Sequence, residues 1–180
     1  MAKRDGKTIT LGSGELFMME FAGTMPEVDA ICVEENRLGH IKGGAAIEYT
    51  MEPYEEKDDL GKVSKIIVTS EEAILKAGLL TWNGDTLTKL VDRGVSTTES
   101  GKRVTKIGGA GNDNGKNYVI CFQHKDPTDG NLWALIKGKN SAGLTITFAT
   151  DSGTLLEPEF KAMPHDEDGT LIKLIEEQTA

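Results

Sequence analysis

In several segments of this chain, apolar residues occupy every second position. In residues 45–51, Ile47, Tyr49 and Met51 alternate with small or polar residues. Residues 65–69 and 144–150 follow a similar alternation, and residues 132–138 are also expected to form a strand. In residues 117–123 both parities are apolar, so both faces of that strand are expected to be covered. Successive side chains of a β-strand point to opposite faces of a sheet, so this period is typical of strands. The pattern predicts a mainly β protein.

Shorter segments complete the expected fold. Two strands are expected at 7–11 and 15–21, around the Gly-Ser-Gly turn at 12–14. Two more are expected at 158–163 and 170–176, around a turn at 164–169, and residues 137–143 are expected to form a hairpin connection.

One segment, residues 81–94, departs from the alternation. Leu87, Leu90 and Val91 have the i, i+3, i+4 spacing of an amphipathic helix, which Gly94 would end. The predicted fold class is therefore mainly β with one short helix, arranged as a β-sandwich or partly open barrel. The length of 180 residues suits a single domain, residues 1–180.

Charge and targeting signals narrow the function classes. The chain has 29 acidic residues against 20 lysines and arginines, a net charge of −9. Such a surface repels phosphate and disfavours nucleic-acid binding. The opening residues "MAKRDGKTIT" contain no apolar signal region, and no apolar run approaches the length of a membrane span. We expect synthesis in the cytoplasm and no membrane partner.

Several residue types could in principle form reactive sites. Cys32 and Cys121 lack the CxxC spacing and are expected to be buried, reduced thiols. The three histidines show no metal-ligand spacing. Gly115-Lys116 lacks both the upstream glycine and the following hydroxyl of a phosphate loop, and Leu171 stands where a calcium loop requires glycine. We therefore expect no enzyme activity, no metal and no cofactor.

The most charged connection is an acidic segment at about 52–62. It contains Tyr54, Glu55, Glu56, Lys57, Asp58, Asp59 and Leu60. A disordered loop, a carboxylate cluster and an arm that contacts another chain would all use such residues. No base or metal-ligand spacing converges on it, and strands are expected on both sides. An extended hairpin that reaches past the domain edge therefore fits best.

The chain resembles the tail tube protein (major tail protein) of long-tailed bacteriophages, especially prophage types from Gram-positive bacteria. The resemblance rests on "LGHIKGGAAIEYT", "YEEKDDLGKV", "TSEEAILKAGLLTWNGDTLTKL", "KIGGAGNDNGKNYVICFQHKDPTDGNLW" and "GLTITFATDSGTLLEPEFKA", in this order over nearly the whole chain. It implies a virion structural protein with a β-sandwich-like fold, six copies of which form a ring. Stacked rings form the hollow tube through which DNA leaves the capsid.

The resemblance also implies partners and places. The acidic segment would be an arm between subunits, and Glu48, Thr50 and Lys65 are predicted to face the lumen, where DNA passes without specific binding. Tape-measure, tail terminator and baseplate proteins would be further partners. The protein would be made in the host bacterial cytoplasm and reside in the virion tail. A β-sandwich binding module, such as an adhesin or carbohydrate binder, and the tube protein of a contractile injection system are alternatives.

Overall fold

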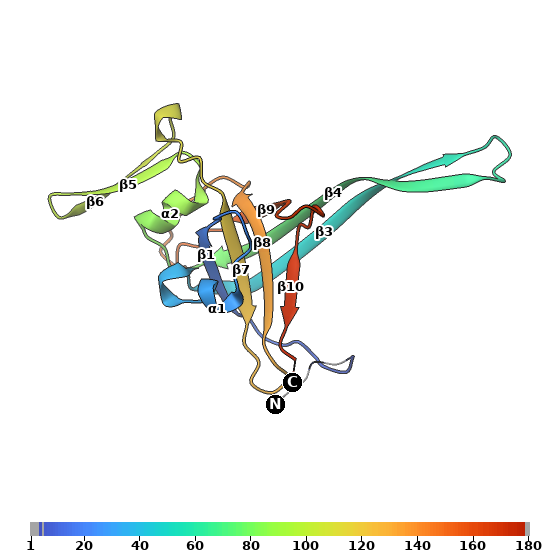
Figure 1. Ribbon diagram of the computed structural model, residues 1–180. Helices are drawn as coiled ribbons and strands as arrows, with labels where there is room; N and C mark the ends of the chain where they lie inside the picture. The colour runs from blue at the N-terminus through green and yellow to red at the C-terminus, as the bar shows by residue number, and fades with distance from the viewer. Residues whose placement is uncertain (1–3, 5, 179–180) are drawn as a thin grey trace.

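A computed structural model describes residue 4 and residues 6–178. An eight-stranded sheet, in which all paired neighbours are antiparallel, forms the body of the protein (Figure 1). A separate two-stranded sheet and short helices accompany it. The mainly β prediction is confirmed, and the large sheet does not close into a barrel within the described residues. The ends of the predicted domain, residues 1–3, 5 and 179–180, lie outside the described residues.

The large sheet has the strand order β2-β1-β7-β8-β9-β4-β3, and β10 pairs with the same edge of β8 as β9 does. Its strands are β1 (Glu15–Glu20), β2 (Arg37–Gly39), β3 (Ile41–Lys57), β4 (Ser64–Leu79), β7 (Tyr118–His124), β8 (Leu132–Asn140), β9 (Glu159–Met163) and β10 (Lys173–Glu176). The small sheet consists of β5 (Gly94–Glu99) and β6 (Lys102–Ile107).

Helical structure is limited. The only helix longer than four residues in the described chain is α2 (Gly84–Leu90); α1 (Val28–Ile31) is a single turn, and 3₁₀ turns occupy Glu34–Asn36 and Ala110–Asn112. The helix expected within 81–94 is confirmed, but it ends at Leu90: Val91 has an extended backbone, and Gly94 begins β5 instead of ending the helix. As expected, it packs on the sheet through Leu87 and Leu90, both of which are buried.

The sheet has an apolar cluster on each face. Ile120 of β7 belongs to the larger cluster with Leu75, Phe160 and the residues of α2, whereas Val119 belongs to a second cluster with Ile31 of α1. Consecutive residues of β7 therefore enter opposite clusters. This explains why both parities of residues 117–123 are apolar.

Three sequence expectations about strands were wrong. Residues 144–150 form no strand; Leu144 and Ile146 pack on the larger cluster as irregular chain. Next to the body, the edge of β4 is occupied by β9 at Ile74–Lys76 and by a bridge from Leu79 to Leu156. Residues 7–11 form no strand either, and Ile9 and Leu11 are exposed, so their alternation does not reflect burial. The hairpin connection expected at 137–143 is instead occupied by β8 as far as Asn140.

Candidate assembly surface

The hairpin of β3 and β4 has two parts with different surroundings. Residues 71–79 of β4 alternate between exposed or half-buried positions and buried ones, with Ala73, Leu75, Ala77 and Leu79 buried. By contrast, every residue from 48 to 71 is exposed. Figure 1 shows the two strands leaving the body together and ending in a turn far from it. We call residues 52–70 the distal arm.

Strand pairing continues along the whole arm, as far as Lys57 opposite Ser64. One irregularity interrupts it: Glu52 pairs with Ser70 but Pro53 pairs with Val68, so β4 has an extra residue there. Proline has no N–H to donate and is tolerated at bulges and on edge strands. Pro53 meets both conditions, because β3 is the last strand in the sheet order.

The turn at the tip is held by Asp58. Its backbone N–H donates to the carbonyl oxygen of Val63 at 3.0 Å, and its carboxylate accepts from the Val63 N–H at 2.7 Å. Gly61 has φ +66°, a left-handed conformation that glycine adopts without strain. The hydrogen bond from the Val63 N–H favours the ionised carboxylate and lowers the pKa of Asp58. The ionised carboxylate of Asp58 therefore stabilises the turn at the tip of the arm.

Apolar side chains are exposed along this arm. Tyr54 is 51% exposed and Leu60 at the tip is 74% exposed. Val63, Ile66, Ile67 and Val68 on the β4 side are exposed as well. By the register, Tyr54 and Ile67 share one face of the arm, whereas Ile66 and Val68 lie on the other. A monomeric soluble protein rarely exposes so many large apolar side chains on one projecting element, and exposed apolar surface marks contact sites.

The other residues predicted for the arm lie among these apolar side chains. Glu55 and Lys57 form an exposed ion pair of 3.1 Å, and Glu56 accepts a hydrogen bond from the Tyr54 hydroxyl. Asp59 is exposed in the turn. The structure thus places all seven predicted arm residues at the far end of the hairpin; their contact with another subunit stays a prediction.

The residues predicted to face a lumen share one face of the hairpin. Glu48 and Thr50 are two positions apart on β3, on the face opposite to the one through which Ile47 packs on the core. Lys65 lies opposite Glu56 in the register, and Glu56 has the same parity on β3 as Glu48. The bulge places Lys65 on this face, because the extra residue in β4 between Val68 and Ser70 reverses which residues of Ser64–Val68 share a face with Glu48.

A second hairpin, β5–β6, leaves the body on the other side (Figure 1). It was not predicted from the sequence, although Ser100-Gly101 between two β-branched runs is a hairpin signal. In the structure both residues have positive φ, 49° and 75°, and join the directly paired Glu99 and Lys102. Two such residues between runs of β-branched side chains are typical of a type I′ hairpin.

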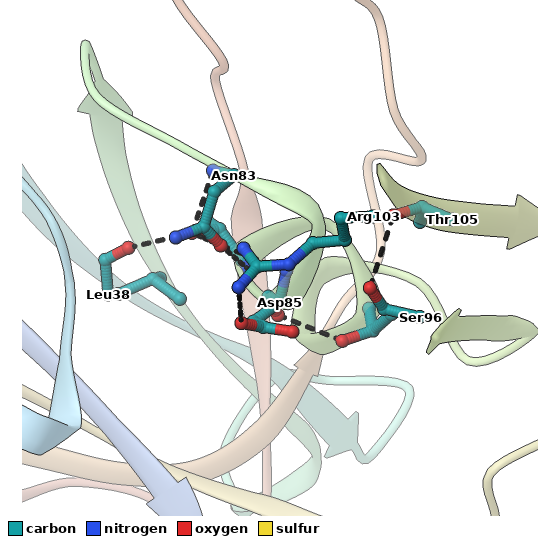
Figure 2. A network of polar contacts seen from close by, with 8 residues as sticks. Leu38, Asn83, Asp85, Ser96, Arg103 and Thr105 are labelled. Carbon is teal, nitrogen blue, oxygen red and sulfur yellow. Dashed lines mark hydrogen bonds and ion pairs between the residues drawn. The ribbon is translucent and has the colours of Figure 1, made fainter. Parts of the chain in front are cut away.

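Polar contacts fasten the base of this second hairpin to α2. Figure 2 shows Arg103 of β6 reaching the Asp85 carboxylate of α2, at 3.2 Å, and Thr105 beside Ser96 of the paired strand. The capping residue Asn83 accepts from the N–H groups of the first helical turn. The helix is thereby held between the sheet and the second hairpin.

Gly84 makes this close approach possible. A Cβ placed there would lie 2.8 Å from Cδ of Arg103 and 3.0 Å from Oγ of Ser96. The first residue of α2 must therefore lack a side chain if β5–β6 is to dock against it.

The two hairpins differ in charge. The distal arm contains five acidic residues and three lysines, a net charge of −2, within a chain of net charge −9. Residues 94–107 contain three basic residues and one acidic residue, a net charge of +2. Oppositely charged surfaces that project in different directions favour contact between successive copies.

Within residue 4 and residues 6–178, no three His, Cys, Asp or Glu side chains lie together as a metal site. No helix of the described chain has the length and apolar character needed to cross a membrane. His124 is buried, with Nδ1 2.8 Å from the carbonyl oxygen of Ser13.

Comparison of the chain with protein-family models gives no match, and comparison with curated protein sequences gives none either.

Proposed function

We infer that the protein is a structural subunit that self-assembles into hexameric rings, which stack into the hollow tail tube of a long-tailed bacteriophage. The observation that carries this proposal is the distal arm. A two-stranded hairpin alone in water is marginally stable, and this one exposes apolar side chains over its length. Contact with another subunit would bury those side chains and hold the arm in place.

The free edge of the large sheet supports the same proposal. β3 ends the strand order, so its outer backbone groups have no neighbouring strand within the described chain. Exposed edges invite pairing with another chain. Pairing of such edges around a ring would join the open sheets of six subunits into one inner barrel. The β-sandwich or barrel arrangement is therefore proposed for the assembled ring.

The placement of the two hairpins favours a head-to-tail contact. An interface between two different surfaces of one chain closes into a ring when the rotation permits and otherwise extends as a filament. The acidic arm and the basic β5–β6 hairpin are different surfaces of opposite charge. Head-to-tail contacts within one ring would close that ring. Arms that reach the next ring would extend the stack of rings into a tube.

The face that carries Glu48, Thr50 and Lys65 is proposed to line the lumen. Near the body this face is polar, and Glu48 forms an ion pair of 3.1 Å with Lys76; Tyr54 and Ile67 lie on the same face farther out along the arm. Neutralised pairs and hydroxyl groups give DNA few free cations to bind, so DNA would pass during ejection without specific contacts. Tape-measure, tail terminator and baseplate proteins are the proposed further partners, and the virion tail is the proposed location.

A binding module such as an adhesin would gather aromatic side chains on one face. The exposed aromatics Tyr49 and Tyr54 instead have opposite parities on β3, and Phe148 lies on irregular chain. The tube protein of a contractile injection system is an alternative that would also assemble as stacked rings. Co-assembly with a sheath protein would distinguish it from the tail tube protein of a long-tailed phage.

Electron microscopy of negatively stained protein tests the proposal. Purified protein at rising concentration, with a crowding polymer to promote nucleation, should form six-fold rings or hollow tubes. Lys102→Glu with Lys106→Glu should weaken assembly, because both lysines have the same parity on β6 and the change reverses the hairpin charge. Monomers at every concentration and in polymer would refute self-assembly.

A further inference from the structure

Two cysteines that are far apart in the sequence lie next to each other in the second apolar cluster. Cys121 lies in the middle of β7, opposite Phe17 of β1 and Leu135 of β8, and its side chain is fully buried. Cys32 directly follows α1 and is partly exposed, so the expectation of burial is confirmed for Cys121 alone. Their sulfur atoms are 3.7 Å apart, although 89 positions separate the two residues.

The two thiols have different surroundings. Only Cys32 is reachable from solvent, whereas Cys121 is enclosed by the sheet. The hydrogen bond between the thiols lowers the pKa of Cys32, while that bond and burial raise the pKa of Cys121. The thiolate is the nucleophile in disulfide exchange. The thiol of Cys32, the more exposed residue, is thus the one that ionises more readily, and the buried thiol of Cys121 lies next to it.

We propose that Cys32 and Cys121 are an oxidisable pair that closes to an intramolecular disulfide on reaction with a small-molecule disulfide such as oxidised glutathione. The Cys32 thiolate attacks one sulfur of the oxidant, forms a mixed disulfide and releases one glutathione thiolate. Cys121 then loses its proton and attacks the Cys32 sulfur, which releases the second glutathione. The protein dithiol is oxidised by two electrons, and the glutathione disulfide is reduced to two thiols.

The position of Cys32 makes closure feasible. A disulfide bond is about 2.05 Å long, so the sulfur atoms must approach each other from van der Waals contact. Cys32 is partly exposed at the end of a helix of four residues, where backbone and side chain adjust more readily than in a central strand. Cys121 need not move from the sheet.

Closure would connect α1 to the central strand and enclose both projecting hairpins in one covalent loop. A cross-link over a long stretch of chain stabilises the fold mainly by restricting the unfolded state. The inference does not depend on the proposed assembly. A chain made in a reducing cytoplasm and later released outside the cell would pass from the dithiol to the disulfide form.

Oxidative titration of the purified full-length protein tests the inference. The fully reduced protein is incubated with rising ratios of oxidised to reduced glutathione, quenched with an alkylating agent and weighed by mass spectrometry. The expected product is a monomer that is lighter by two hydrogen atoms and carries no alkyl group. Its urea midpoint should be higher than that of the reduced protein and return on reduction.

Single substitutions provide matched controls. Cys121→Ser should stop at the mixed disulfide, with one glutathione on Cys32, whereas Cys32→Ser should remain reduced because Cys121 is enclosed. Circular dichroism verifies that each variant folds. If the wild-type protein retains two alkylatable thiols in excess oxidant, takes up two glutathiones or forms only disulfide-linked dimers, the inference is wrong. These wild-type outcomes hold even if a variant fails to fold.

Discussion

Removal of the distal arm should separate assembly from folding. In the arm-deletion variant, an Asn-Gly turn replaces residues 53–69 and joins Glu52 to Ser70, which already lie opposite each other in the register. Every deleted residue is exposed. The deleted ion pair between Glu55 and Lys57 is also exposed, and such pairs contribute about 0–1 kcal/mol.

The free energy of unfolding should therefore change by no more than about 1 kcal/mol, as is usual for exposed positions. Since the deleted residues are already accessible in the folded state, the slope of the urea curve should change little. Assembly, by contrast, should be abolished, because the exposed apolar side chains of the arm are gone. Urea denaturation followed by circular dichroism measures the first effect, and electron microscopy measures the second.

A substitution nearer the body of the same strand provides the matched control. Leu75 is fully buried on β4 opposite Ile47, and truncation of a buried leucine to alanine costs about 2–5 kcal/mol. Leu75→Ala should thus destabilise the fold while leaving the arm in place. If the arm deletion costs as much as Leu75→Ala, the arm belongs to the folding unit and the division between arm and body is refuted. If rings still form without it, the arm is not the assembly element.

Three further predictions concern smaller features. Asn83→Ala removes the cap of α2, whose oxygen accepts from two backbone N–H groups, and should lower the free energy of unfolding by about 0.5–2 kcal/mol in urea. Gly84→Ala should force the side chain of Arg103 away and release the β5–β6 hairpin from α2, seen as faster amide hydrogen exchange in that hairpin; unchanged exchange would contradict the docking. The lowered pKa of Asp58 means that the tip turn is stabilised above the usual pKa of an unfolded aspartate, about 3.9, and loses this stabilisation as pH falls through the lower folded value. The amide proton of Val63 should accordingly become less protected below about pH 4 in NMR exchange measurements, and Asp58→Asn should remove most of that pH dependence.

Local patterns carried much of the fold. The apolar residues of 117–123 and 132–138 predicted β7 and β8, because both faces of these two strands pack on apolar clusters. The helix spacing within 81–94 predicted α2, because Leu87 and Leu90 pack on the larger cluster. The acidic segment was expected to be a projecting hairpin because it is charged, lacks a converging site and lies between strands.

Tertiary structure decided what depends on neighbours distant in the sequence. Alternation at 144–150 matches that of a strand, yet the segment pairs with no strand and packs on the larger cluster as irregular chain. The shared face of Glu48 and Lys65 depends on a bulge at Pro53; proline is compatible with a bulge or an edge strand, so the residue alone does not fix the register. The contact of Cys32 with Cys121 arises because α1 folds over the central strand. Short-range periodicity thus determined by itself those strands and the helix whose apolar residues face the core. Which alternating segments pair as strands, their register, and contacts across 89 positions followed from how the chain packs.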